Sequence, residues 1–156
     1  MDAMEQPQRV DVPRLMGLDV GDRRIGVALS DQLGLTAQPL LTITRTNRRA
    51  DLSSLRRIIR KHGIAEIIVG NPLYMSGDLS PQAAKAQAFA ATLVEEFHLP
   101  MHLWDERLTT TQAHRQLDDA GHAKMGRKGI IDQLAAVLIL QAFLDHRHSS
   151  MRGTKG

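Results

Sequence analysis

Three acidic side chains stand where the neighbouring residues predict burial. Asp19 lies near the end of an apolar strand-like segment, Glu106 follows another such segment, and Asp132 lies in the first turn of an apolar helix-like segment. Asp and Glu are almost never fully buried without a partner, and no Lys or Arg has the spacing to pair with all three. Two carboxylates about 4 Å apart repel by roughly 4 kcal/mol at an effective dielectric constant near 20. If the three acids converge, a divalent metal ion would neutralise them.

Carboxylate oxygens are hard ligands that suit Mg²⁺ or Mn²⁺. Two such ions about 3.5–4 Å apart can activate a water and stabilise the leaving oxygen in phosphodiester hydrolysis. The pattern therefore predicts Asp19, Glu106 and Asp132 as both metal ligands and catalytic residues of a two-ion hydrolase. Each acid also has a simpler explanation: Asp19 as a turn cap, Asp132 as a complement to the helix dipole, and Glu106 as a partner of Arg107. We favour the shared site because perturbed acids cluster at functional sites.

The elements that must position these acids alternate between strand and helix patterns. Asp51, Ser80 and Thr109 are expected helix caps, and Gly63 is expected to end the first helix. This order predicts an α/β fold of three layers, with a five-stranded mixed sheet and helices on both faces. The expected strands are 15–20, 25–30, 35–44, 66–70 and 101–104, and the expected helices end near residues 62, 98, 121 and 146, the last of them starting near 130.

The predicted topology would bring the three acids to one rim of the sheet. Ligands bind outside the carboxyl ends of parallel strands in folds of this kind. Asp19 ends the first strand and Glu106 follows the last, so they become neighbours if the first strand is central. On the final helix, Asp132 shares a face with Ala136 and Ile139. Because that apolar face must pack on the sheet, Asp132 should point inward as well.

Composition narrows the remaining possibilities. A chain of 156 residues, 42% of them apolar, is typical of a single soluble domain. It has no cysteine, which excludes disulfides, thiolate catalysis and cysteine-based zinc sites. Its net charge of +3 is compatible with a polyanionic partner without requiring one. The N-terminal segment is polar and the longest apolar run, 134–140, is too short to cross a bilayer, so we expect a cytoplasmic protein with no membrane partner.

Four ordered motifs resemble those of a known family. They are LDVG with GVALSD (18–21 and 26–31), VGNPL (69–73), DERLTT (105–110) and IDQLAA (131–136). Together they cover about residues 14–146 and resemble the YqgF/RuvX family of pre-16S rRNA nucleases, which are similar to Holliday-junction resolvases. The resemblance implies an RNase H-like fold and cytoplasmic 5′-end processing of the 16S rRNA precursor in ribosome biogenesis. It also implies Asp19, Glu106 and Asp132 as the acidic set.

The pattern along the chain, with the span of the resemblance, suggests how the chain is divided. We expect a disordered lead-in over 1–13, an RNase H-like nuclease domain over 14–146 and a flexible basic tail over 147–156. One departure from the family pattern is Asn71, where an apolar residue usually precedes Pro72. It adds a polar group near the end of a strand but leaves the acids unchanged.

Two basic segments are the expected contacts with nucleic acid. Lys124, Arg127 and Lys128 lie in a glycine-punctuated segment before the last helix, and Arg23 and Arg24 follow the first strand. Lys and Arg side chains beside a metal centre would bind phosphates and position the substrate. The simpler explanation is a solvated loop with ordinary surface charges.

Three functions remain open from the sequence. The leading hypothesis is a metal-dependent nuclease acting on pre-rRNA. The second keeps the same site but cleaves a four-way DNA junction, which requires two active centres and therefore a homodimer, whereas a monomer would count against it. The third is a catalytically silent nucleic-acid-binding protein in transcription or ribosome assembly, whose acids serve no reaction.

Overall fold

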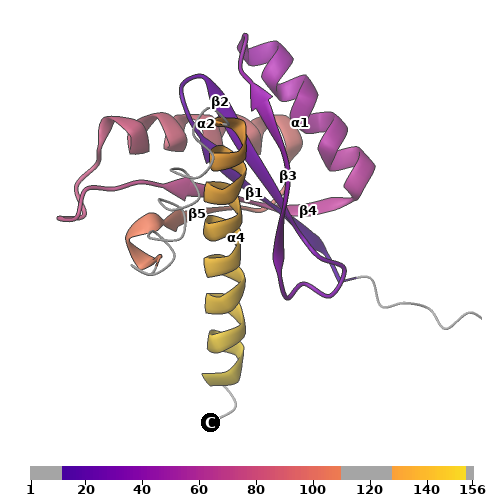
Figure 1. Cartoon of the computed structure of the whole chain (residues 1–156), viewed down its shortest axis with the longest axis vertical. Coiled ribbons are helices and arrows are strands. Elements are labelled where there is room, and N and C mark those ends of the chain that lie inside the picture. The colour runs from indigo at the N-terminus through magenta and orange to yellow at the C-terminus, as the bar shows by residue number, and fades with distance from the viewer. Residues whose placement is uncertain (1–11, 110–127, 154–156) are drawn as a thin grey trace, which may run out of the picture.

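A five-stranded mixed sheet forms the centre of the computed structural model, which describes residues 12–109 and 128–153 (Figure 1). Its strand order is β3-β2-β1-β4-β5, with β1 in the middle. β1 pairs antiparallel with β2 and parallel with β4, and β4 pairs parallel with β5. The predicted mixed sheet is thus confirmed, and β1 has the central position on which the expected neighbourhood of Asp19 and Glu106 depended. The strands are β1 (Arg14–Val20), β2 (Arg24–Ser30), β3 (Ala37–Thr44), β4 (Ile64–Asn71) and β5 (Met101–Asp105).

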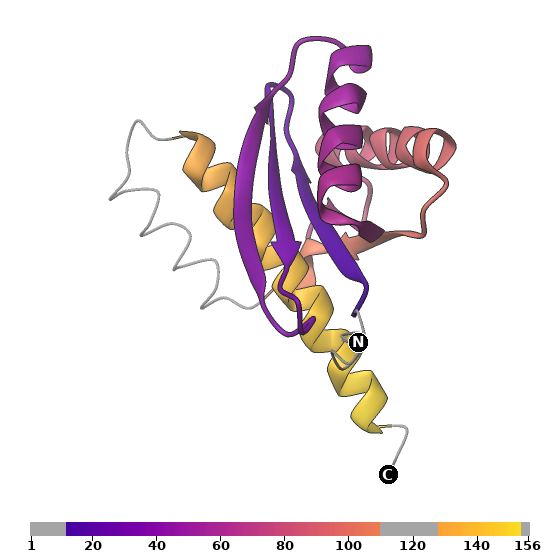
Figure 2. The same cartoon turned by 90° about the vertical axis from the view of Figure 1, so that its right-hand side faces the viewer.

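Helices cover both faces of this sheet, as Figure 2 shows in side view. One face carries α1 (Arg48–His62) and α2 (Pro81–Phe97), and the other carries α4 (Lys128–Gly153). A short 3₁₀ turn, η2 (Glu106–Leu108), follows β5 directly. The three-layer α/β arrangement expected from the order of the elements is therefore the observed one.

The alternation of side chains along β1 separates the two layers. Met16, Leu18 and Val20 are buried against α1 and α2. The residues between them face α4, where Gly17 lets the helix lie very close, since a Cβ at Gly17 would come within 2.7 Å of the Leu140 Cβ. Asp19 follows the same alternation and therefore lies on the α4 face.

Two predicted helix boundaries were wrong. The N-cap of α1 is Asn47, whose side chain accepts a hydrogen bond from the backbone N–H of Ala50, and not Asp51. Asp51 is buried in the first turn, where its carboxylate accepts from Arg45 Nε at 3.1 Å. At the other end of the chain, α4 continues to Gly153, so the part of the expected flexible tail over 147–153 is helical. The predicted caps at Ser80 and Gly63 are confirmed.

Two further predictions concern the helix after Thr109 and the absence of a membrane-spanning segment. The helix predicted to begin at Thr109 and end near residue 121 lies outside the described residues from residue 110 onward. Within the described part, the segment Gly129–Met151 of α4 is long and apolar enough to span a membrane by length and composition. The same helix buries Ala136, Ile139 and Leu140 against the sheet, which accounts for its apolar character within the fold.

Candidate active site

Asp19 lies on β1 between two glycines of the neighbouring strands. Its partner on β2 is Gly26, and Gly70 is next to it on β4, one residue beyond the pair formed by Leu18 and Val69. Glycines have no side chain to cover the carboxylate, so the sheet surface on both sides of Asp19 is open for groups from other elements. Glu106 and Asp132 approach through these two openings.

Glu106 reaches toward Asp19 over Gly70. It begins η2 directly after β5, and its Oε2 lies only 2.8 Å from the place where a Cβ on Gly70 would stand. A side chain at position 70 would therefore displace this carboxylate. Arg107 does not neutralise it, because that guanidinium binds Asp105 instead, with Nη2 2.7 Å from Oδ2. The simpler explanation of Glu106 as a partner of Arg107 is thus wrong.

Asp132 comes to the opposite side of Asp19 from the first turns of α4. Its backbone oxygen would lie 1.9 Å from a Cβ at Gly26, so only glycine lets the helix lie this close to β2. Its carboxylate accepts a hydrogen bond from Arg24 Nε at 2.6 Å. The predicted inward direction of this face is supported by Ala136 and Ile139, which are buried against the sheet.

The electrostatics of the site follow from burial of acids near one another. Burial, and then repulsion from Asp132, raise the pKa of Asp19 to about 6. Burial, followed by repulsion from Asp19 and then from Asp105, likewise raises the pKa of Glu106 to about 7. Within residues 12–109 and 128–153, no Lys, Arg or His nitrogen lies within 4 Å of the carboxylate of Asp19 or Glu106. Asp19 is thus the middle member of a row of three acids.

The oxygen donors of this row are chemically suited to a divalent cation, but the three acids do not lie close enough together to share one. Asp19 and Glu106 are hard oxygen donors that lack a counter-cation among the described residues, as a divalent ion site requires. No group of three His, Asp or Glu side chains in the described part of the chain is close enough to hold one metal ion together. Asp132 is held by Arg24, so joint coordination by all three acids requires that this ion pair open.

The predicted nucleic-acid contacts have different outcomes. Arg24 is engaged with Asp132, whereas Arg23 is exposed at the tip of the β1–β2 hairpin. Lys124 and Arg127 lie outside the described residues, and Lys128 is described only as the first residue of α4. Their proposed role therefore stays a prediction.

Sequence reasoning missed Gly26 and Gly70, which make the convergence of the acids possible. The signal was available, because a glycine inside a strand often marks a close approach of another backbone or side chain. Asn71, the departure from the family pattern, ends β4, and its Oδ1 accepts from Gln87 Nε2 at 3.3 Å. That contact ties the polar side chain to α2, away from the acidic row.

Comparison with known proteins supports the pattern of motifs. Residues 13–146 match a family model described as RuvX: Holliday junction resolvase. The chain is 49% identical over 144 residues to a protein of Koribacter versatilis named "Putative pre-16S rRNA nuclease", covering 92% of this chain and 94% of that one. A protein of the same name from Moorella thermoacetica is 52% identical over 132 residues, covering 85% and 94% of the two chains.

Solved structures confirm the fold at low sequence identity. RuvC of T. thermophilus, solved in complex with a Holliday junction substrate, superposes with a TM-score of 0.56 at 14% identity. The match covers 88% of this chain and 96% of that one. A second RuvC structure from Thermus thermophilus gives a TM-score of 0.51 at 13% identity. The predicted RNase H-like fold is therefore confirmed.

Proposed function

The chain belongs to the RuvX family, and from this membership we propose that it is a metal-dependent nuclease that hydrolyses phosphodiester bonds in pre-16S rRNA. The reaction would process the 5′ end of the precursor in the cytoplasm during ribosome biogenesis. The name shared by the relatives that are about half identical over nearly their whole length supports this substrate.

The observation that carries the proposal is the row formed by Glu106, Asp19 and Asp132. Two of its members have raised pKa values, caused first by burial, and no cation beside them among the described residues. Such an arrangement is unfavourable for a purely structural site and favourable for a site that accepts a cation. It therefore supports Asp19, Glu106 and Asp132 as the residues that would hold Mg²⁺ or Mn²⁺.

Bound divalent ions would supply a Lewis acid for the scissile phosphate and lower the pKa of a coordinated water. Asp19, between the other two acids, would hold the ions at the centre of the row. Glu106 would fix the side toward β5. Asp132 would join once released from Arg24, whose guanidinium would then be free to face a substrate phosphate.

The test is cleavage of an RNA that carries the 5′ leader of pre-16S rRNA, with and without Mg²⁺ or Mn²⁺. Asp19→Asn keeps the size of the side chain but removes its charge, and we expect it to reduce cleavage roughly 1,000-fold. Asp22→Asn is a matched control, because this exposed acid lies in the adjacent hairpin and pairs with Lys85 on the surface. Equal cleavage by the wild type and Asp19→Asn would refute the assignment.

A second candidate function is resolution of a four-way DNA junction. The description of the family and the shared fold with RuvC favour it. The same preparation should be offered RNA, linear DNA and junction DNA, and its mass in solution measured by light scattering. Preferential junction cleavage by a dimer would favour the resolvase. Binding of these substrates without cleavage of any of them would instead favour a catalytically silent binding protein.

A further inference from the structure

Helix α1 has a much larger net positive charge than the rest of the chain. It contains six of the chain's 20 Lys and Arg residues but one of its 17 Asp and Glu residues. The helix therefore has a net charge of about +5, and the remainder of the chain, whose total is +3, has a net charge of about −2. The weakly basic character of the whole protein thus hides one strongly basic helix.

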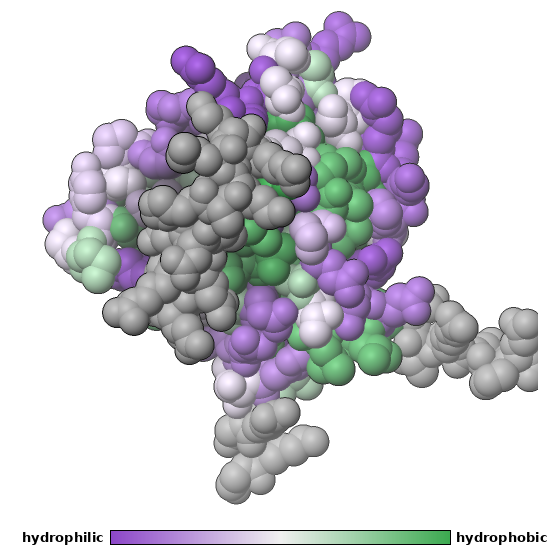
Figure 3. Space-filling model, in the orientation of Figure 1, coloured by the Kyte–Doolittle hydropathy of each residue, from purple (hydrophilic) through white to green (hydrophobic). Residues whose placement is uncertain are grey.

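Most of these cations have no acidic partner. Within the described residues, Arg48, Arg49, Arg57, Arg60 and Lys61 form no ion pair, and all five are exposed. The one acid of the helix, Asp51, is buried and bound by Arg45, which precedes the helix. The sixth cation, Arg56, pairs with Glu96 of α2 and lies over the ring of Phe97. Hydrophilic residues accordingly gather over α1 in Figure 3.

The first turn of α1 is an unfavourable place for two of these cations. A helix N-terminus carries a partial positive charge, so basic side chains there cost stability rather than add to it. Arg48 and Arg49 stand at this end and form no ion pair with any described residue, since Asp51 of the same turn is bound by Arg45. Arg60 and Lys61, at the other end, do complement the helix dipole. Stability therefore does not explain Arg48 and Arg49.

The basic helix begins at the same end of the molecule as the acidic row. The backbone N–H of Arg45 donates to Arg23 O at 2.8 Å, and Arg45 Nη1 donates to Gly21 O at 2.9 Å. These contacts fix the start of α1 beside the tip of the β1–β2 hairpin. Arg24, which binds Asp132, and the exposed Arg23 of the hairpin tip therefore lie at the same end of the sheet as the start of α1, while α1 itself covers the face opposite to the acidic row.

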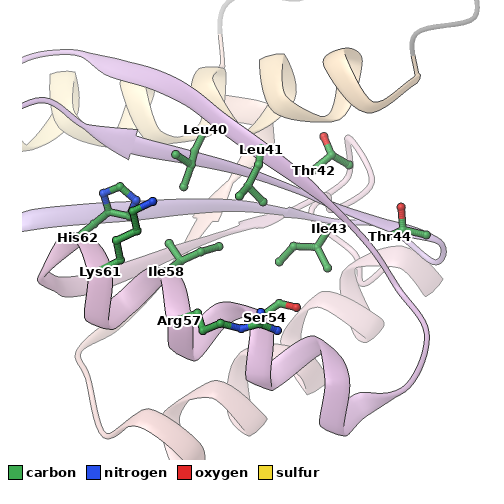
Figure 4. Close-up of a pocket in the computed structure, with 10 residues that line it drawn as sticks. All are labelled: Leu40, Leu41, Thr42, Ile43, Thr44, Ser54, Arg57, Ile58, Lys61 and His62. Atoms are coloured by element: carbon green, nitrogen blue, oxygen red, sulfur yellow. The ribbon is translucent and has the colours of Figure 1, made fainter.

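The surface is hollowed on both flanks of α1. A groove of about 500 Å³ lies between α1 and β3, with Arg57 and Lys61 beside the apolar side chains of Leu40, Leu41 and Ile58 (Figure 4). A second hollow of about 430 Å³ is lined by Arg48, Arg49, Leu52, Arg56 and Glu96. Cations next to apolar side chains suit a nucleotide chain, in which phosphates alternate with less polar sugars and bases.

We propose that the outer surface of α1, formed by Arg48, Arg49, Arg57, Arg60 and Lys61, binds the phosphate backbone of the nucleic-acid substrate away from the cleavage site. This inference rests on the proposed nuclease function. The 15 residues of α1 extend for about 22 Å, which corresponds to about six nucleotides of one strand at 3.4 Å each. The surface compensates for the acidic row, which repels phosphates until cations are bound.

The test measures binding rather than cleavage. Affinity for a fluorescent single-stranded RNA, and for DNA of the same sequence, is titrated across salt concentrations in chelator. The variants are Arg48→Gln/Arg49→Gln and Arg57→Gln/Lys61→Gln, because Arg, Lys and Gln have similar helix propensities. The control Ser149→Glu/Ser150→Glu changes the net charge by the same two units at exposed positions of α4.

Each α1 variant should lower the slope of log affinity against log salt by about 1.4, and the same relation gives roughly 25-fold weaker binding at 0.1 M salt. The control should keep the wild-type slope. Thermal unfolding of Arg48→Gln/Arg49→Gln should occur at the same or a higher temperature, because the dipole repulsion is removed. An unchanged slope in the α1 variants, or an equal loss in the control, would overturn the proposal.

The nuclease function and the binding surface on α1 can be refuted independently of each other. A wild-type protein that binds RNA through α1 but cleaves nothing would remove the nuclease function and leave the binding surface intact. A protein that cleaves RNA with the same KM in the wild type and both α1 variants would remove the binding surface and leave the nuclease function intact. In the expected case, KM rises in both α1 variants while kcat changes little.

Discussion

Two acidic regions lie on the same face of the sheet, and the pKa values of their acids are shifted in opposite directions. At the amino end of β4, Glu66 accepts two hydrogen bonds from Arg147, at 2.9 and 3.0 Å, and lies 2.8 Å from His102 Nε2. The pKa of Glu66 is lowered to about 2, and the hydrogen bond from Arg147 is the largest cause. At the carboxyl ends of β1 and β5, Asp19 and Glu106 have raised pKa values and no cation beside them among the described residues.

The difference between the regions lies in the supply of counter-charge rather than in burial alone. Helix α4 crosses both regions, bringing a cation to Glu66 at its end and a further acid, Asp132, to Asp19 at its start. A structural acid is therefore recognised by the guanidinium that the fold provides for it. Asp19 and Glu106 have no such partner among the described residues, which supports the proposal that they are ligands for an external cation.

The largest expected effect is the loss of activity in one region only. Asp19→Asn should reduce metal-dependent RNA cleavage roughly 1,000-fold, because preorganised electrostatic groups of an active site contribute on this scale. Glu66→Gln makes the same chemical change in the other region and should leave kcat within a few-fold of the wild type. Single-turnover cleavage at saturating Mg²⁺ measures both. Similar losses in the two variants would remove the distinction between the regions.

The pH dependence of stability should have opposite signs in the two regions. Asp19 and Glu106 have folded pKa values of about 6 and 7, above their ordinary values of 3.8 and 4.5. The folded state therefore holds more protons between about pH 4 and 7, and stability falls as pH rises through this window, by roughly 3 kcal/mol for the pair after allowance for partial exposure. The folded pKa of Glu66, about 2, makes stability fall instead as pH decreases from about 4.5 to 2.

Urea unfolding in the presence of a chelator, from pH 2 to 8, measures the free energy of unfolding across both pH ranges. The pKa of His62 is lowered, first by burial and then by Arg14 and Lys61, and this group acts against the fall between pH 4 and 7. The comparison is therefore the wild type against Asp19→Asn/Glu106→Gln, which retains His62. The double variant should be more stable than the wild type at pH 7, and it should lack the fall in stability between about pH 4 and 7. An identical profile in both proteins would show that the acids are not destabilised by burial.

Sequence patterns could predict which acids converge because the determinants are local. Apolar residues before Asp19 and Glu106 identified strand ends, and the helical spacing of Asp132 with Ala136 identified its face. These strand ends and this helix face need no knowledge of contacts between distant segments. The central position of β1 does depend on such a contact, the pairing of β1 with β4, and it entered the prediction only as a condition.

The features that were missed depend on partners far along the chain. Arg24 and Asp132 are separated by 108 positions, and Arg147 and Glu66 by 81. No periodicity reveals such pairs, so the basic residues after position 146 suggested a tail rather than the end of α4. The cap of α1 was a different error, because Asn47 and Asp51 are both good cap residues and the side chain of Asp51 is bound by Arg45.

The glycines beside Asp19 give the next prediction. Gly26→Ala would place a Cβ 1.9 Å from the backbone oxygen of Asp132, so the start of α4 must move. Overpacking of this kind costs about 1–3 kcal/mol in the free energy of unfolding, and cleavage should fall together with stability because Asp132 shifts away from the row. Gly63→Ala is a control outside the site, since it adds strain at a positive φ of 62° with no neighbouring atom within 4 Å. Full activity in Gly26→Ala would separate Asp132 from the reaction.

A smaller effect is expected from the structural acid itself. Glu66→Gln should lower the free energy of unfolding by about 1 kcal/mol at pH 7, because charge-assisted hydrogen bonds from Arg147 are lost but both side chains keep some contact with solvent. Chemical unfolding at neutral pH measures it. Asp19→Asn should change stability in the opposite direction in the same assay. Destabilisation by both substitutions would mean that Asp19 also has a structural cation.

The smallest expected effect concerns Asp132, which combines features of both regions. Asp132 lies in the acidic row but is bound by Arg24, as a structural acid would be. Arg24→Gln removes this competitor, so the affinity for Mn²⁺ in the absence of RNA should rise a few-fold, which calorimetry can measure. Arg23→Gln is the matched control, since Arg23 is exposed and its side chain has no ion pair within the described residues. Weaker binding of Mn²⁺ by Arg24→Gln than by Arg23→Gln would mean that Arg24 orients Asp132 for the metal instead of competing with it.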